Sequence, residues 1–378
     1  MPPTLIDMRR KAFLLILLAF FTCGSTYAVT VATYTHAPDT LDTRLYNHAK
    51  NAPSDISEDL DKLVEYLKQP AANKRDIVKA FSYWIMQNIS YDINGFLTNT
   101  FNNDGVSGTL KRKIGVCQDY SELFKAMCDR AGIQCYIIPG YAKGFGYKPG
   151  NRFDKSNHAW NVIWLDNNYL LLDLTWSSGY VEYVDDAWRF SIRPDITQFL
   201  SRPEKFVEKH LPADPKWQLL HYPVSMKNFM KFESGRDMLR DSSNYFSFAD
   251  SISSFEKLDP AIRELKAAED AYRFYPVIAD YAYHYYNQAV TLSNAATDNY
   301  NSAVSSYNKS VTESGTPKAS GDYNTTVVSN AINNYSKAIN LLKKIGNYSD
   351  NEINTRDLFD KCKMGLDASN ELMKTLQQ

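Results

Sequence analysis

A cysteine at the start of a predicted amphipathic helix constrains this chain more than any other feature. Residues 115–124 read GVCQDYSELF: Gly115 marks a turn, and apolar residues then recur at helical spacing up to Gly132. Cys117 therefore stands in the first turn of the helix, where unpaired backbone N–H groups and the helix dipole favour a thiolate and could hold an oxyanion. A cysteine at such a place is more often a small buried residue, so a functional interpretation needs support from elsewhere in the chain.

A predicted β-hairpin supplies that support. Two strand-like runs flank the polar residues 166–168. A two-residue turn there puts His158 and Asp173 on one face of the hairpin, and a turn at the first two positions pairs Trp160 with Asp173, so that His158 becomes the diagonal neighbour of the carboxylate. A three-residue loop would separate His158 from Asp173 unless a bulge restored the phase. The aspartate interrupts a leucine-rich run and therefore requires a buried partner.

These segments resemble the transglutaminase-like superfamily, the papain-like group with a Cys-His-Asp triad, and within it the kyphoscoliosis-peptidase branch. The residues that carry the resemblance are GVCQDY at 115–120, HAWN at 158–161 and LDLTW at 172–176. Further similarity lies in ISYD at 89–92, in AGI and YIIPGY at 131–133 and 136–141, and in HLPADPKWQLL at 210–220, which is similar to the kyphoscoliosis-type extension. The resemblance covers about residues 60 to 230.

The resemblance implies an α+β fold, with a papain-like core in which the nucleophile helix packs on an antiparallel sheet. It also implies a catalytic triad of Cys117 as nucleophile, His158 as base and acid, and Asp173 as the group that orients the imidazole. The backbone N–H of Cys117 is one expected oxyanion donor. Further residues are expected to line the substrate site or to complete the oxyanion hole: Tyr91, Gln118, Trp160 and Trp176.

Two classes of function stay open. The first is a cysteine-dependent enzyme that acts on amide bonds of a protein or peptide substrate through an acyl-enzyme, as a thiol peptidase, a transglutaminase or a deamidase; the extension at 210–220 favours the peptidase. The second is a non-catalytic binding or scaffolding protein on the same fold. Because all three triad residues are present, the enzyme is the favoured interpretation.

Neither a cofactor nor a metal is predicted, because Cys117, His158 and Asp173 have no ligand-type residues at short spacing around them. The formal net charge is −1, so nothing in the charge balance indicates binding to nucleic acid or to an anionic membrane surface.

The N-terminus reads as a secretory signal peptide over residues 1–28. Basic residues at 9–11 precede an apolar run at 12–21 that is too short to span a bilayer, and small residues end the segment at Ala28. A secreted or periplasmic protein is therefore predicted. Cys23 raises the alternative of a lipoprotein, but the residues before it lack the small side chains expected for lipidation. No later segment is apolar enough to span a membrane.

The rest of the chain divides into two predicted parts after a lead-in. Residues 29–59 have few periodic signals and are expected to be irregular, and the core with its extension is expected over 60–233. Within and before the core, the patterns predict helices at 54–67 (with Ser57 as N-cap), 74–89 and 204–211, a strand at 136–141, loops at 91–107 and 143–157, and one or two more sheet strands at 180–193.

Residues 240–378 lose the strand signals and predict an independent, all-helical domain. A short motif that begins with tyrosine recurs at spacings that are multiples of seven, and a breaker-rich stretch at 314–321 separates two long helices. The spacing predicts that these tyrosines pack between helices, in preference to forming a ligand surface: Tyr286, Tyr300, Tyr307 and Tyr335. A docking role for this domain, with a protein partner, also stays open.

Overall fold

The computed structural model describes residues 40–102, 104–239, 244–314, 321–350 and 353–377. The predicted signal peptide and the first part of the expected lead-in lie outside the described residues. Within the described ranges, no helix combines the length and the apolar character needed to cross a membrane.

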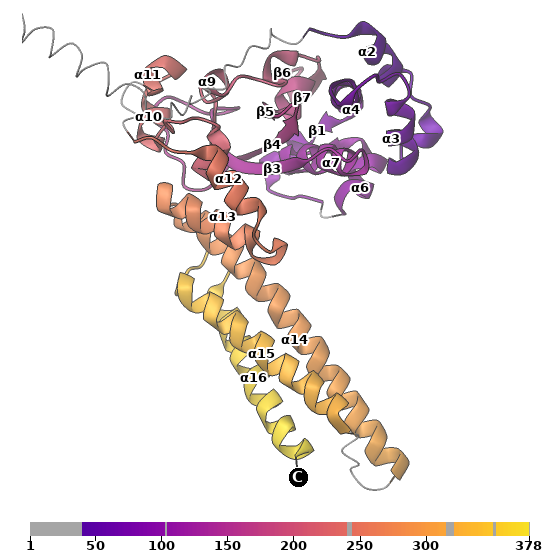
Figure 1. The fold of residues 1–378 in the computed structure, drawn as a ribbon, viewed down its shortest axis with the longest axis vertical. Helices are drawn as coiled ribbons and strands as arrows, with labels where there is room; N and C mark the ends of the chain where they lie inside the picture. Colours follow the sequence, from indigo (N-terminus) through magenta and orange to yellow (C-terminus); the bar gives the residue numbers. More distant parts are fainter. Residues whose placement is uncertain (1–39, 103, 240–243, 315–320, 351–352, 378) are drawn as a thin grey trace, which may run out of the picture. The chain divides into compact units, whose positions relative to one another are not determined.

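A four-stranded antiparallel sheet forms the centre of the core, and the nucleophile helix α7 (Cys117–Arg130) packs on it (Figure 1). The strand order is β5-β4-β3-β8, with bounds Asn168–Leu172, His158–Leu165, Cys135–Ala142 and His210–Pro212. The apolar face of α7 supplies Leu123, Phe124 and Met127, all fully buried. The α+β class and the helix-on-sheet core expected from the sequence are therefore confirmed.

The expected irregular lead-in is wrong for its described part. Residues 40–59 contain the helix α2 (Thr43–Lys50) and a 3-10 turn, η1 (Ser54–Ile56). Asp42 caps α2 by accepting hydrogen bonds from two backbone N–H groups, and Leu45 and Ala49, one turn apart, are fully buried on the side that packs against α4 (Lys74–Asn88).

The next predicted helix lies where the sequence placed it, but with a later start. The helix α3 (Leu60–Lys68) is capped by Asp59 and not by Ser57, because the Asp59 carboxylate accepts from the N–H groups of residues 61 and 62. The predicted helix at 74–89 is present as α4, which Asn73 caps.

The predicted loop at 91–107 is also wrong in part, because two short helices form there. A parallel pair, β1 (Ser90–Tyr91) with β2 (Ile114–Gly115), brackets α5 (Ile93–Thr98) and α6 (Gly105–Arg112). Asp92 caps α5 through the N–H of Gly95, which explains a helix in an Asn- and Gly-rich stretch.

Residues 180–193 do not extend the central sheet. They form a separate antiparallel hairpin of β6 (Gly179–Val184) and β7 (Ala187–Ile192), closed by Asp185 and Asp186 at positive φ. The cause is the short helix α8 (Leu174–Ser178), which begins directly after β5 and turns the chain away from the sheet.

The predicted helix at 204–211 is shorter than expected and is followed by a strand. The helix α9 covers Pro203–Phe206, and β8 then pairs with the far edge of β3, where His210 lies opposite Ala142. A 3-10 turn, η3 (Pro215–Gln218), and the short helices α10 (Met226–Lys231) and α11 (Gly235–Leu239) follow.

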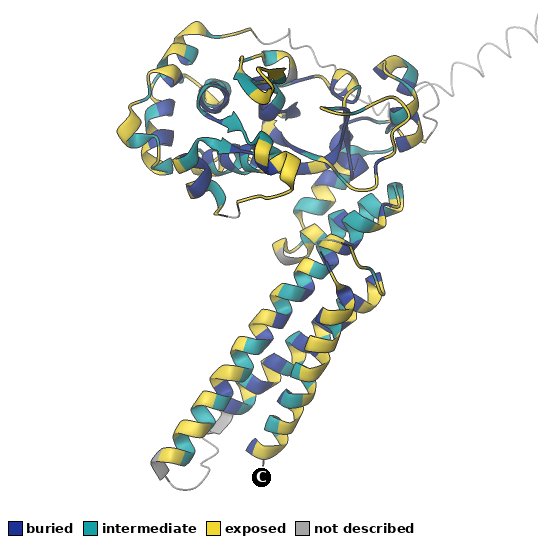
Figure 2. Cartoon of the chain, turned by 180° about the vertical axis from the view of Figure 1, so that it is seen from behind, coloured by how far each residue is buried: buried dark blue, intermediate teal, exposed yellow. Residues whose placement is uncertain are grey.

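Helices make up the remaining described part of the chain: α12 (Phe248–Glu256), α13 (Pro260–Phe274), α14 (Ile278–Ser314), α15 (Gly321–Ile345) and α16 (Thr355–Leu376). The three longest pack along one another, each with a buried and an exposed face (Figures 1 and 2). The fully buried seam of α14 is a heptad series of alanines, which lets the helices approach closely: Ala282, Ala289, Ala296 and Ala303.

The tyrosines expected in this seam flank it. Tyr335 of α15 is buried, and its hydroxyl lies 2.9 Å from Thr297 Oγ1 of α14. Tyr286, Tyr300 and Tyr307 are all half-buried. Tyr286 and Tyr307 pack against the buried clusters between the helices. The expected inter-helix position therefore holds for three of the four tyrosines, and the alanines of α14 are more completely buried than these tyrosines.

The described residues from 240 onward are not set apart from the core by their contacts, because they belong to the same compact unit as the core. Ile252 of α12 is fully buried in one cluster with Trp160 and Trp217 of the core. Glu256, at the end of α12, accepts hydrogen bonds from the hydroxyls of Tyr136 and Tyr169 on the central sheet.

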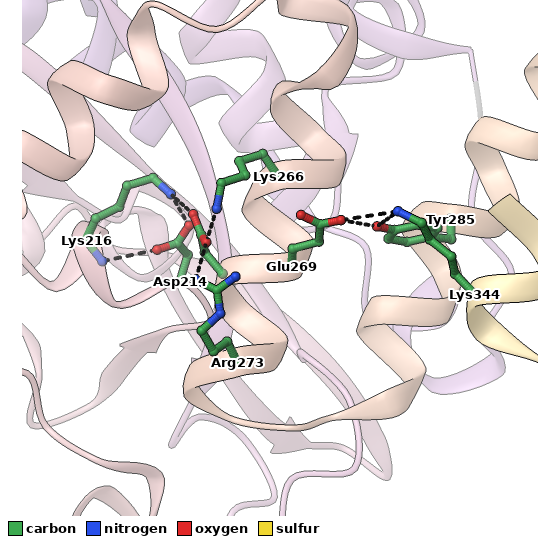
Figure 3. A network of polar contacts seen from close by, with 8 residues as sticks. Asp214, Lys216, Lys266, Glu269, Arg273, Tyr285 and Lys344 are labelled. Carbon is green, nitrogen blue, oxygen red and sulfur yellow. Dashed lines mark hydrogen bonds and ion pairs between the residues drawn. The ribbon is translucent and has the colours of Figure 1, made fainter. Parts of the chain in front are cut away.

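Polar contacts continue this junction into α13 and α14. The buried Lys216 of η3 pairs with Asp214 and lies 3.9 Å from Asp270 of α13 (Figure 3). Asp280, in the first turn of α14, accepts a 2.8 Å hydrogen bond from the Tyr141 hydroxyl of β3. The helices up to the start of α14 therefore belong to the packing of the core.

Candidate active site

Cys117 is the first residue of α7, as the sequence predicted. Asp119 fixes this start, because its Oδ2 accepts a 2.7 Å hydrogen bond from the N–H of Val116, the residue before the helix. Gly115 leaves the room for that carboxylate, since a Cβ there would lie 2.5 Å from the Cβ of Asp119. The half-buried thiol thus sits at the positive end of a 14-residue helix.

The hairpin has the predicted register. Leu165 pairs with Asn168, so that Asp166 and Asn167 form a two-residue turn, and both have positive φ as a type I′ turn requires. Asn161 pairs with Leu172, and the same phase carries Asp173 to the face of His158. The Nε2 atom of His158 lies 2.8 Å from Oδ2 of Asp173.

Asp173 has no exposed surface and accepts three hydrogen bonds. His158 and His210 both approach Oδ2 through Nε2, and the backbone N–H of Trp176 donates to Oδ1 at 3.1 Å. Burial acts to raise the pKa of Asp173, but the charge and hydrogen bond of His158 and the hydrogen bond of His210 outweigh it and hold the pKa well below its usual range. The carboxylate is therefore ionised, and it also serves as the N-cap of α8.

His158 interacts with the acid and with the thiol. Burial acts to lower the pKa of His158, whose side chain is 8% exposed, but the charges of Asp173 and Cys117 and hydrogen bonds to both raise it to about 10. Because Nε2 is occupied by Asp173, Nδ1 is the nitrogen left to face the thiol. This arrangement favours a thiolate–imidazolium pair.

His210 is the site residue that sequence reasoning missed. The segment 210–220 supported the family resemblance, but nothing in it assigned this histidine to the site. In the structure His210 has no exposed surface, and its Nε2 lies 2.9 Å from Oδ2 of Asp173. The strand that carries His210 has only three residues, so no periodic pattern in the sequence could have found it.

Two of the four predicted lining residues contact the histidines. The rings of Trp160 and Trp176 lie with their centroids 5.9 Å and 5.6 Å from that of His158. Trp160 is buried and Trp176 is half-buried, so both shield the His158–Asp173 hydrogen bond from water.

The other two differ in their placement. Tyr91 lies opposite Gly115 in the β1–β2 pair, and burial together with the charges of Cys117 and Asp173 raises the pKa of its phenol, which therefore stays a neutral donor. Gln118 is exposed, and its side chain donates to Glu122 along the surface of α7 at 2.8 Å. The structure thus brings Tyr91 to the site, whereas the Gln118 side chain is engaged elsewhere.

The spacing of His158, Asp173 and His210 would also suit a metal ion, because one ligand atom of each lies within 4.8 Å of the others. The hydrogen bonds account for the same closeness, since both imidazoles approach one carboxylate oxygen through Nε2. A metal ion would need both nitrogens unprotonated, and the carboxylate would then lose two of its three donors.

The remaining cysteines of the described chain differ from Cys117. Cys128, Cys135 and Cys362 are buried and free. Burial raises the pKa of the Cys128 thiol, with a contribution from Cys135, and burial also raises that of Cys362. The expectation that Cys128 and Cys135 are small buried residues is confirmed, and the raised pKa values hold the thiols of Cys128 and Cys362 in the protonated, unreactive form.

Comparison with known proteins identifies the core. Residues 61–174 match the family model described as the transglutaminase-like superfamily. The kyphoscoliosis peptidases of Mus musculus and Homo sapiens are 34% and 37% identical over 192 and 171 residues, which are 50% and 45% of this chain and 29% and 26% of those proteins. The Lim and transglutaminase domain protein ltd-1 of Caenorhabditis elegans is 27% identical over 186 residues, 47% of this chain and 25% of that protein. The chain thus covers less than a third of these relatives.

Proposed function

Because residues 61–174 form a transglutaminase-like domain, similar to that of the kyphoscoliosis peptidases, we propose that the protein is a cysteine-dependent enzyme that acts on amide bonds of polypeptides through an acyl-enzyme. The observation that carries the proposal is the buried His158–Asp173 hydrogen bond, 2.8 Å long, beside a thiol at the N-terminus of α7. A charged imidazole between a thiolate and a carboxylate is the arrangement that a thiol nucleophile requires.

The steps follow from the positions of the three groups. The thiolate of Cys117 attacks the amide carbonyl carbon, so that an S–C bond forms and a tetrahedral oxyanion develops. The imidazolium of His158 then protonates the leaving nitrogen as the C–N bond breaks, which leaves a thioester on Cys117. Water or an amine, deprotonated by the now neutral His158, resolves the thioester and restores the thiolate and the imidazolium.

The oxyanion is assigned two donors. The backbone N–H of Cys117 belongs to the first turn of α7, where N–H groups have no partner within the helix. The Tyr91 hydroxyl is the second, supported by its position beside Gly115 and by its electrostatic interaction with Cys117.

The surface beside the site supports a polypeptide substrate with apolar side chains. Trp188 and Phe190 alternate onto one face of the β6–β7 hairpin. The Phe190 ring lies 6.3 Å from Tyr91 of the site, and the Trp188 ring lies 4.9 Å from Phe145. Trp188 is 42% exposed and Phe145 53% exposed. Exposed aromatic side chains next to a nucleophile suit an apolar segment that flanks the scissile amide.

Among the three reactions that share this acyl-enzyme, hydrolysis of a peptide bond is the one proposed. The similarity to two proteins named kyphoscoliosis peptidase supports it. The protein is further proposed to be exported, on the basis of the signal-like pattern at 1–28.

The test uses a denatured protein substrate, with and without a primary amine, and compares the full chain with Cys117→Ala. New N-termini in the products, absent with Cys117→Ala, are expected. Incorporation of the amine, or conversion of glutamine to glutamate without chain cleavage, would replace the peptidase by a transglutaminase or a deamidase. If the full chain and Cys117→Ala gave identical products, Cys117 would not act as a nucleophile, and the non-catalytic scaffolding function would be favoured.

A further inference from the structure

His210 is built into the site beside Asp173, where it approaches the same carboxylate oxygen, Oδ2, as His158. It belongs to β8, which pairs with β3, so backbone hydrogen bonds of the central sheet fix its position. Its ring is stacked on Phe206, with centroids 4.2 Å apart, and lies 4.4 Å from Trp176 and 5.2 Å from Trp160. These rings surround the imidazole, and its Nε2 lies 2.9 Å from Oδ2 of Asp173.

The imidazole of His210 is a neutral donor and not a second cation. Burial lowers its pKa, although the hydrogen bond and the charge of Asp173 act against this, and the positive charge of His158 lowers it further. The Phe206 carbonyl acts to raise the pKa, but the effect of burial is larger, and Nδ1 has no partner at hydrogen-bond distance and angle. A buried nitrogen without a partner costs less as a bare acceptor than as an N–H group, so the single proton belongs on Nε2.

We propose that His210 is a positioning residue: its Nε2–H holds the carboxylate of Asp173 so that Oδ2 faces His158 while the Trp176 N–H holds Oδ1. The inference rests on the proposed function of the same site. Asp173 sits at the junction of β5 and α8, where its backbone belongs to neither element. Two donors on different elements, β8 and α8, therefore define the plane of the carboxylate.

Two effects of removing the donor have opposite signs and can be told apart. If His210 only shares the charge of Asp173, its loss makes the carboxylate a stronger partner and His158 keeps its proton to higher pH. If His210 positions Asp173, its loss lets the carboxylate turn away and His158 loses its proton at lower pH. The proposal predicts the second outcome.

The experiment follows the rate of Cys117 alkylation by iodoacetamide against pH in the full chain. The variants are His210→Phe, which keeps the ring but not the donor, and His210→Gln, which keeps a terminal N–H. His221→Phe is the matched control, because His221 also lies between aromatic rings, 5.2 Å from Tyr245 and 5.0 Å from Phe248, and makes no hydrogen bond with Asp173.

In His210→Phe the alkylation rate at neutral pH is expected to fall about 10- to 100-fold, as for a lost hydrogen bond to a charged group. The change in this rate that reports the loss of the His158 proton is expected to move to lower pH. His210→Gln should restore most of both, and His221→Phe should match the unmodified protein. If that change in rate stayed at the same pH, or moved to higher pH, in a folded His210→Phe variant, the proposal would be overturned.

A second measurement determines the tautomer of His210 in the unmodified protein, so it does not depend on whether a variant folds. In ¹⁵N spectra of the full chain labelled at histidine, His210 is expected as the neutral Nε2–H form at neutral pH, where His158 stays charged. A neutral Nδ1–H form, or titration near neutral pH, would remove the donor and overturn the proposal. Both measurements are independent of catalytic turnover. If the pH profile of alkylation shifted as expected but no protein substrate were cleaved, the positioning role of His210 would be supported and the proposed enzymatic function would be refuted.

Discussion

The imidazole of His158 and the carboxylate of Asp173 meet across the β4–β5 hairpin, with Nε2 2.8 Å from Oδ2. His158 is the first residue of β4, and Asp173 follows the last residue of β5, so the register of one hairpin determines their distance. Asp173 also caps α8 through the Trp176 N–H. The acid is thus held by secondary structure on both sides, as a group that orients a catalytic imidazole must be.

Asp173→Asn is expected to lower kcat/KM by about 10²- to 10⁴-fold, because an amide cannot accept from two imidazole N–H groups and the Trp176 N–H at once. The variant should still fold, since the amide oxygen can cap α8. Asp195→Asn is the control, because Asp195 caps a 3-10 turn of the core through Thr197 N–H and contacts no histidine. Near-normal activity of Asp173→Asn would mean that another residue orients His158.

Cys117 is expected to react with iodoacetamide faster than Cys128, Cys135 or Cys362 near neutral pH, by at least about tenfold. It alone among these cysteines combines a helix N-terminus, partial exposure and an interaction with His158. Masses of the labelled peptides after short exposure of the folded protein give the four rates. Removal of the partner, in His158→Gln, should slow Cys117 and leave the others unchanged. If all four cysteines of the unmodified protein were alkylated at equal rates, Cys117 would not be an activated thiolate.

The sequence was sufficient for the hairpin and the nucleophile helix because both are local. Asp166 and Asn167 tolerate positive φ, so the turn length and the facing of His158 and Asp173 follow from adjacent residues. His210 could not be predicted in this way, since it reaches Asp173 through a three-residue strand whose pairing with β3 joins Ala142 and His210, 68 residues apart. Short strands without alternation leave no pattern to detect.

The helical part was misjudged for a related reason. The tyrosines are prominent in the sequence because they are large, whereas alanines such as Ala289 and Ala296, which are fully buried between the helices, look unremarkable in a sequence. Likewise, nothing local in the sequence reveals that Glu256 accepts hydrogen bonds from Tyr136 and Tyr169 on the sheet.

The catalytic rate is expected to stay high through neutral pH and to fall as the pH approaches about 10, where His158 loses the proton that it must give to the leaving amine. Because its pKa is raised, the stabilisation from this ion pair is complete below roughly pH 6.5, the value of an unperturbed histidine, and is lost as the pH rises through about 10. Profiles of kcat/KM and of Tm against pH test both. An alkaline limb near pH 7 would contradict the raised pKa.

Trp188→Ala and Phe145→Ala are each expected to raise KM for an apolar peptide substrate about 5- to 50-fold with little change in the alkylation rate of Cys117. Both rings are exposed and in contact with each other beside the site. Tyr180→Ala is the matched control, because Tyr180 is 45% exposed on the opposite face of the same hairpin, where it pairs with Ser191. Equal effects of Tyr180→Ala and Trp188→Ala would show that the hairpin matters only for stability.

A chain that ends at Glu233 is expected to lose the folded core, although the sequence alone suggested that it would survive. The cut removes Ile252, which is fully buried against Trp160 and Trp217. It also removes Glu256, which accepts from Tyr136 and Tyr169, and so leaves polar groups of the sheet without their partner. The exposed apolar surface should cause a lower Tm and aggregation.

A chain that ends at Tyr281 keeps these residues and the Asp280–Tyr141 hydrogen bond, so it is expected to remain folded and to retain Cys117 alkylation. Point variants of the full chain separate packing from length: Ile252→Ala should lower the free energy of unfolding by about 2–5 kcal/mol, whereas Ile262→Ala, at a side chain 49% exposed, should change it by less than about 0.5 kcal/mol. Urea titrations followed by tryptophan fluorescence measure both, because Trp160 and Trp217 line the cluster. If the chain ending at Glu233 were as stable as the one ending at Tyr281, the helices α12 and α13 would rest on the core without contributing to its stability, and the boundary near residue 240 would stand after all.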